Sequence, residues 1–178
     1  MYLLKGLPNS MQEQFTGALR AITTEHGYIH QGIAYIMREI LTVTTTASSY
    51  IDFTTPADKT IHFRPSSFAS NGDNITIEIF EDASVTGGTT YAAKNRNRNS
   101  NNTSQVSITI NPTVNTEGNI IDKFYVGGGS GISDTTSGAI TGNVDEWVLK
   151  PDTTYLIKIT NNGASDSNVF VNLFWYEE

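Results

Sequence analysis

Apolar residues recur at every second position in most of the chain from Gly32 onward. Such alternation places apolar side chains on one face of a strand and polar side chains on the other, as expected for half-buried strands. The β-branched and aromatic residues at these positions also favour strands. The clearest alternation predicts strands at 75–80, 106–110, 155–160 and 169–176, and shorter apolar runs predict strands at 33–44, 49–54, 60–64, 89–93, 120–126 and 144–149.

Turn-forming pairs separate these segments, including Asn71-Gly72, Gly87-Gly88, Pro151-Asp152 and Asn162-Gly163. About eight to ten antiparallel strands in one chain predict an all-β fold, a single antiparallel β-sandwich for which the jelly roll is favoured. A length of 178 residues suits one domain of this kind.

The N-terminal region has a different pattern. Residues 1–31 are predicted to form a short arm and a short helix, and residues 32–178 the β-sandwich domain. The helix is expected at about 9–23, because Ser10 and Glu13 form a capping box. Its apolar positions follow helical spacing: Phe15, Ala18, Leu19 and Ile22. No helix is expected after it.

The arm carries four apolar side chains ahead of Pro8: Tyr2, Leu3, Leu4 and Leu7. Apolar residues on a terminal arm either fold back on their own domain or dock on a neighbouring molecule. We interpret these four as candidate contacts with a partner or a second subunit.

Composition narrows the function classes. The net charge of −7 argues against nucleic acid as a partner, because an acidic surface repels phosphate. The absence of cysteine excludes a thiol nucleophile, a zinc–thiolate site and a disulfide scaffold. The N-terminus lacks the pattern of a signal peptide and no run of 18 apolar residues occurs, so no membrane association is expected.

Two segments have the composition of surface loops, 94–104 and 127–142, and are expected to be mobile or held by a partner. The first contains Arg96 and Arg98, whose guanidinium groups could anchor the protein to an acidic partner surface. Two other interpretations stay open for them, a solvated loop tip and a nucleic acid contact, although no aromatic residue lies between them for base stacking.

His26 and His30 are the first candidates for a metal site. In a zinc-protease motif two histidines four residues apart lie on a helix with a glutamate between them, whereas Gly27 and a β-prone segment occur here. We therefore expect these histidines to lie in a strand, about 13 Å apart and too distant to share an ion. A structural role is favoured, and no metal or other cofactor is predicted.

The sequence contains little that indicates a catalytic site. No G-x-S-x-G elbow accompanies the three histidines, and the cluster typical of a cupin does not occur with His26, His30 and His62. Two carboxylates could converge in a glycosidase-like pair. The acids considered for such a pair are Glu78, Glu81, Asp82, Asp145 and Glu146. Since 18 acids in a β-sandwich are mostly solvated, we expect that the protein is not an enzyme.

Several short motifs resemble a known family. They are His26-x-x-x-His30-x-Gly32, Gly87-Gly88-Thr89, Asn95-Arg96-Asn97-Arg98, Leu149-Lys150-Pro151-Asp152-Thr153-x-Tyr155-Leu156, Asn161-Asn162 and Leu173-x-Trp175-Tyr176-Glu177. This combination, which covers about residues 25–178, resembles the head decoration (cement) proteins of tailed bacteriophages. The family implies no catalytic residues for this chain.

The resemblance implies a structural virion protein that is made in the host cytoplasm and binds the outside of the assembled head, where it stabilises contacts between major capsid subunits. The expected partner is the major capsid protein, and a homo-oligomer is expected, with a trimer favoured over a dimer because symmetric oligomers match symmetric lattice sites. The alternative is a carbohydrate- or receptor-binding module of a tail or head fibre, for which Tyr125, the glycines of 127–131 and Asp134 could form a site.

Overall fold

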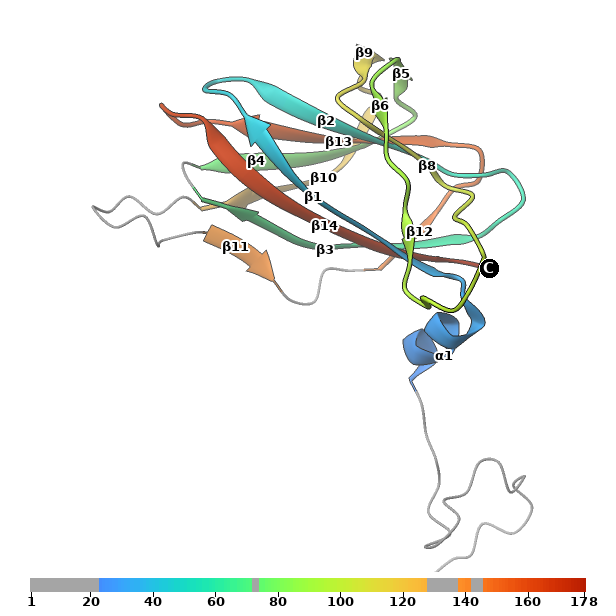
Figure 1. The fold of residues 1–178 in the computed structure, drawn as a ribbon. Coiled ribbons are helices and arrows are strands. Elements are labelled where there is room, and N and C mark those ends of the chain that lie inside the picture. The colour runs from blue at the N-terminus through green and yellow to red at the C-terminus, as the bar shows by residue number, and fades with distance from the viewer. Residues whose placement is uncertain (1–22, 72–73, 128–137, 142–145) are drawn as a thin grey trace, which may run out of the picture.

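The computed structural model describes residues 23–71, 74–127, 138–141 and 146–178 and is an all-β sandwich with one short helix at one end (Figure 1). The predicted fold class is therefore confirmed. The elements are α1 Thr24–Gln31, β1 Ala34–Val43, β2 Ser48–Thr54, β3 Ile61–Ser70, β4 Ile75–Glu81, β5 Ser84–Thr86, β6 Thr89–Thr90, β7 Lys94–Asn95, β8 Ser107–Ile110, β9 Thr113–Thr116, β10 Asn119–Val126, β11 Gly138–Thr141, β12 Trp147–Leu149, β13 Thr154–Asn161 and β14 Ser167–Glu177.

The strands form two six-stranded sheets. Sheet I has the order β11-β3-β14-β1-β7, with β12 also paired to β3, and sheet II has the order β10-β4-β13-β2-β8-β6. The antiparallel pairs are nested along the chain, since β1 pairs with β14, β2 with β13, β3 with β11 and β12, and β4 with β10. Strands β1 to β4 alternate between the two sheets. This nesting defines a jelly roll, as the sequence favoured.

The connection between β4 and β10 covers one side of the sandwich. It contains the two-stranded β5–β9 pair, and it adds β7 to the edge of sheet I beside β1 and β8 and β6 to the edge of sheet II beside β2. Exposed strand edges are prone to pair with other chains. The connection therefore protects the edges that β1 and β2 would otherwise leave open.

The core lies between the sheets and is lined by the alternating apolar residues that the period of two predicts. Trp175 is fully buried, and its ring meets Phe53 edge to face with 5.2 Å between the centroids. Phe53 also contacts Phe63, with 4.8 Å between the two ring centroids. A small apolar gap beside these rings has a volume of about 10 Å³, room for about one water molecule. The core is thus closely packed around Trp175.

Each of the ten predicted strand segments overlaps an observed strand, whereas β5, β7, β9 and β11 were not predicted. The prediction of no helix after residue 23 was wrong, because α1 begins at Thr24, and so was the assignment of His26 and His30 to a strand. The helix expected at 9–23 lies almost entirely outside the described residues, as do the arm residues Tyr2, Leu3, Leu4 and Leu7. Among the described residues, no helix is long and apolar enough to cross a bilayer.

Candidate functional site

Helix α1 is short, and both of its ends are capped. The Thr23 side chain accepts a hydrogen bond from the His26 amide at 3.3 Å, which satisfies one of the free N–H groups of the first turn. Gly32 follows the helix with φ of 72°, the left-handed conformation of a C-cap, and a Cβ at this position would collide with Ser100. These caps explain why a segment that contains Gly27 is helical.

The segment 95–102, predicted as a mobile or partner-held loop, is fixed to the end of α1 by its own amide side chains. Buried Asn95 donates from Nδ2 to the Gly32 carbonyl at 2.8 Å, and Asn102 donates to the same oxygen at 3.2 Å. Asn97 donates to the carbonyl of His30 at 3.1 Å. The asparagines therefore satisfy carbonyl groups that the end of a helix leaves without partners.

The inner side of α1 packs on the outer face of sheet I. Tyr28 and Ile29 contact the buried residues Ala34, Phe174 and Tyr176. The ring of Tyr176 is stacked between Tyr28, 4.3 Å away, and His62, 4.4 Å away. This small second core attaches the helix to β1, β3 and β14, outside the main core.

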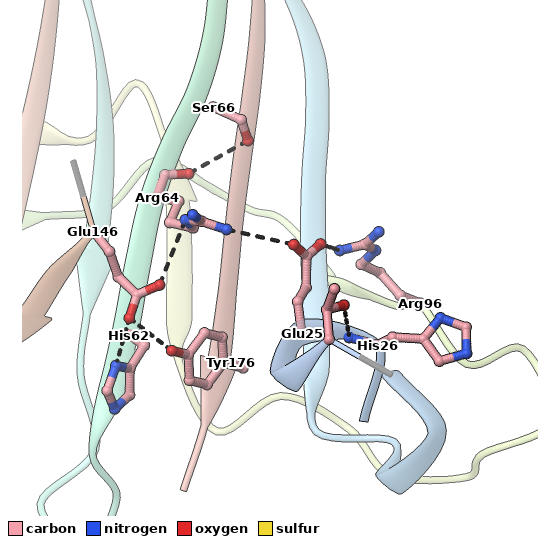
Figure 2. A network of polar contacts seen from close by, with 9 residues as sticks. Glu25, His26, His62, Arg64, Ser66, Arg96, Glu146 and Tyr176 are labelled. Atoms are coloured by element: carbon pink, nitrogen blue, oxygen red, sulfur yellow. Dashed lines mark hydrogen bonds and ion pairs between the residues drawn. The ribbon is translucent and has the colours of Figure 1, made fainter. Parts of the chain in front are cut away.

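A chain of alternating acidic and basic side chains surrounds this second core (Figure 2). Glu25 of α1 binds Arg96 at 2.6 Å through one oxygen and Arg64 of β3 at 3.4 Å through the other. Arg64 continues to Glu146 at 3.5 Å, and Glu146 continues to His62 at 3.0 Å. Five residues that are far apart in sequence thus link the helix, the loop after β7, strand β3 and the residue before β12.

Aromatic contacts reinforce this chain of charges. The guanidinium carbon of Arg96 lies 4.5 Å from the ring centroid of Phe174, in a cation–π contact. The Tyr176 hydroxyl donates to Glu146 at 2.6 Å. We refer to Glu25, Tyr28, His62, Arg64, Arg96, Glu146, Phe174 and Tyr176 as the α1 cluster.

The protonation of the α1 cluster follows from these contacts. Burial acts to raise the pKa of Glu146, but hydrogen bonds from Tyr176 and His62 and the charge of Arg64 outweigh it, so that the pKa lies below its usual value. Burial, followed by the hydrogen bond to Glu146, raises the pKa of Tyr176. Glu146 is therefore ionised and Tyr176 neutral near pH 7.

The α1 cluster contains the residue types of an acid–base site, but its histidine has no ring nitrogen free to take up a proton from a substrate. His62 is bound at Nδ1 by Glu146 at 3.0 Å and at Nε2 by Glu178 at 3.2 Å. A general base or a metal ligand needs a free ring nitrogen. Both nitrogens of His62 already have partners, so the geometry supports a role in holding α1 against the sheet.

The two arginines proposed as partner contacts differ in their surroundings. Arg96 is held by Glu25 and Phe174 within the α1 cluster. Arg98 is exposed, and its guanidinium donates a long hydrogen bond of 3.5 Å to the Asn95 carbonyl. Arg98 is thus the more accessible of the two for a partner.

The acids that could have formed a glycosidase-like pair are mostly paired with cations. Glu78 binds Lys123 at 2.9 Å, while Glu81 binds Lys150 at 2.5 Å and accepts from Tyr155. Asp145 lies outside the described residues. In addition, all three histidines of the chain lie outside the space between the sheets, so they do not form a cupin-type set there.

The outer face of sheet I carries a row of apolar and cationic side chains beside the α1 cluster. Ile40 is 64% exposed and lies opposite Phe170, which is half-buried. Exposed Arg38 lies two residues along the same face, where its Nε donates to Asn172 at 3.2 Å. Ile36 follows, opposite Phe174. We refer to Ile36, Arg38, Ile40 and Phe170 as the sheet I face.

An open hollow of about 460 Å³ lies near the same end of the sandwich, beside Tyr35 and Asn102. Its wall includes the buried carboxylate of Glu177, which accepts hydrogen bonds from Ser104, the Gln105 amide and Trp175. The carboxylate is thus saturated by the protein itself, and we assign the hollow no ligand.

Comparison of the chain with protein-family models, with curated proteins and with solved structures finds no match.

Sequence reasoning missed most of the α1 cluster, because residues 25, 64, 96, 146 and 176 come together only through the pairing of β1, β3, β12 and β14. A local signal for α1 itself was present. Thr23 followed by Glu25 in the first turn, with Gly32 just after the segment, has the pattern of a helix start and stop.

Proposed function

We propose that this protein is a capsid decoration protein of a tailed bacteriophage, which binds the outside of the assembled head and bridges neighbouring capsid subunits as a homo-oligomer. The observation that carries the proposal is the contrast between the α1 cluster, whose charges are paired within the chain, and the sheet I face, where Ile40 is exposed and Ile36 and Phe170 are half-buried. Such a surface is suited to binding rather than to catalysis.

The composition of the sheet I face supports a protein partner. Centres of protein interfaces are enriched in aromatic residues and arginine and poor in other charged residues. Phe170 and Arg38 fit this pattern, with Ile40 between them on the same face. The jelly roll is also a fold of virion proteins. These points agree with the resemblance described above.

Multivalent binding would give the protein a high overall affinity for the capsid. Binding through one sheet I face buries a few side chains, and each contributes about 1.5–3 kcal/mol to the free energy of binding. The free-energy cost of association reduces this gain. A homo-oligomer on a symmetric site makes several such contacts at once and gains avidity without any single strong contact.

The alternative function is glycan or receptor binding by a fibre module. Tyr125 favours it, because this side chain is 65% exposed at the end of β10, and exposed aromatic rings suit sugar binding. Asp134, the other residue considered for such a site, lies outside the described residues.

Co-sedimentation with empty phage capsids that lack this protein tests the proposal. The variant Ile40→Asp changes the sheet I face, and Ile120→Asp is the matched control, since Ile120 is 53% exposed on the outer face of sheet II. Wild type and Ile120→Asp should co-sediment, and Ile40→Asp should bind at least about tenfold more weakly, equivalent to the loss of one buried apolar contact. Binding of the wild type to host glycans, with none to capsids, would support the alternative.

A further inference from the structure

His26 and His30 lie one turn apart on the exposed side of α1. Their Nε2 atoms share a hydrogen bond of 2.8 Å, in which either ring could be the donor, and their ring centroids are 4.5 Å apart. Both residues are exposed. Figure 2 shows the ring of His26 turned away from the carboxylate of Glu25.

The helix that carries the pair is held in place before any ligand arrives. Thr23 caps its start and Gly32 its end, Asn97 binds the His30 carbonyl, and Glu25 is fixed by two arginines. A pair of donors on a fixed helix turn loses little conformational freedom on binding, which favours chelation.

The distance between the two nitrogen atoms indicates a class of metal ion. Imidazole nitrogens bind first-row ions at about 2.0–2.1 Å, which gives a separation of about 2.9 Å at a right angle and roughly 3.3 Å at a tetrahedral angle. The observed 2.8 Å is closer to the right angle. Adjacent ligands at right angles are typical of Cu²⁺ and Ni²⁺, the ions that imidazole sites also bind most strongly in the first-row series.

We propose that His26 and His30 form a two-histidine chelate site for Cu²⁺ or Ni²⁺ on the surface of α1, with water in the remaining coordination positions. Among the described residues, no group of three or more potential metal ligands occurs, so the described part of the chain supplies these two donors to the ion. The net charge of −7 favours the approach of a divalent cation.

Titration calorimetry with Ni²⁺ on the full chain tests the site. Loss of even an outer-shell partner costs about 10–100-fold in metal affinity, so His26→Gln or His30→Gln should weaken binding by at least about tenfold. The matched control is the double variant His30→Gln/Gln31→His. It keeps two histidines but places them five positions apart, off a common face of the helix.

The control variant should lose binding as the single variants do, and Cu²⁺ added to the wild type should give an electron paramagnetic resonance spectrum with two coupled nitrogens. Far-ultraviolet circular dichroism of each variant without metal verifies that it folds. Equal Ni²⁺ affinity in the wild type and the control variant, or a Cu²⁺ spectrum without two nitrogens, would overturn the proposal.

Discussion

At the scale of single residues, two glutamates stabilise the structure in different ways. Glu25 divides its two oxygens between Arg96 and Arg64 at the surface, where solvent screens the ion pairs. Glu177 is only 4% exposed and is surrounded by hydrogen-bond donors. A buried carboxylate is costly unless its oxygens are satisfied, so Glu177 depends on every one of these donors.

Glu177→Gln should lower the free energy of unfolding by about 1–3 kcal/mol, because one oxygen that accepts a hydrogen bond is replaced by an NH₂ group, which donates and cannot accept. The exposed residue Asp58 provides the control, and Asp58→Asn should change stability by less than about 0.5 kcal/mol. Urea unfolding monitored by Trp fluorescence measures both. Equal stability of the two variants would show that the bonds around Glu177 contribute nothing.

Acid should loosen the α1 cluster through Glu146. The folded pKa of this carboxyl lies below its ordinary value of 4.5, so the native state is favoured above pH 4.5 and this contribution is lost as the pH falls through the folded pKa. Glu146→Gln should therefore destabilise the protein at pH 7 but less at pH 3. Thermal melts across this range test it, and a constant difference between variant and wild type would contradict the assignment.

At the scale of elements, α1 is attached by the second core on sheet I and by side chains from the loop after β7, outside the main core. Arg96 covers the Phe174 ring and binds Glu25, whereas Arg98 lies outside these contacts. The two arginines therefore have different expected roles, although they are two residues apart in an Asn-rich segment.

Arg96→Ala should lower stability by about 0.5–2 kcal/mol, the sum of one partly exposed ion pair and one cation–π contact, and should speed amide hydrogen exchange in α1. Arg98→Ala should leave exchange in α1 unchanged and weaken capsid binding instead. Hydrogen exchange by mass spectrometry gives the first result and co-sedimentation the second. Faster exchange in α1 of both variants would contradict the distinction.

The strands could be predicted from the sequence because the period of two, as in Ile75, Ile77 and Ile79, is a local signal. The fixed positions of Asn95, Asn97 and Asn102 could not be predicted from the sequence. A polar composition does not reveal that these amides bind the end of a helix 63 to 70 positions earlier in the chain. Nor could the α1 cluster be predicted, since its members are brought together by strand pairing. The sequence pattern does not contain the information on which distant strands pair and in which register.

At the scale of the whole molecule, the jelly roll is closed on one side by the connection from β4 to β10, and α1 lies near the C-terminus at one end (Figure 1). The sheet I face remains open beside it. Under the proposed function this face contacts the capsid, and α1, which follows residues 1–22 in the chain, is held against the same sheet.

Deletion of residues 1–8 should leave the melting temperature within a few degrees, because residues 25–29 make the described contacts of α1 with sheet I. Oligomer formation or capsid attachment should fall by about tenfold or more if Tyr2, Leu3, Leu4 and Leu7 dock on a neighbour, since repeated small contacts add avidity. Analytical ultracentrifugation and differential scanning calorimetry measure the two effects. Unfolding of the truncated protein would show that the arm belongs to the fold.

The most direct measurement for the central claim is an electron cryo-microscopy map of capsids incubated with the purified protein, compared with capsids alone. We expect additional density on the outer surface at a local symmetry axis, into which the sandwich fits with the sheet I face and Ile40 toward the shell. Capsids without additional density, or density only on a tail or head fibre, would contradict the central claim.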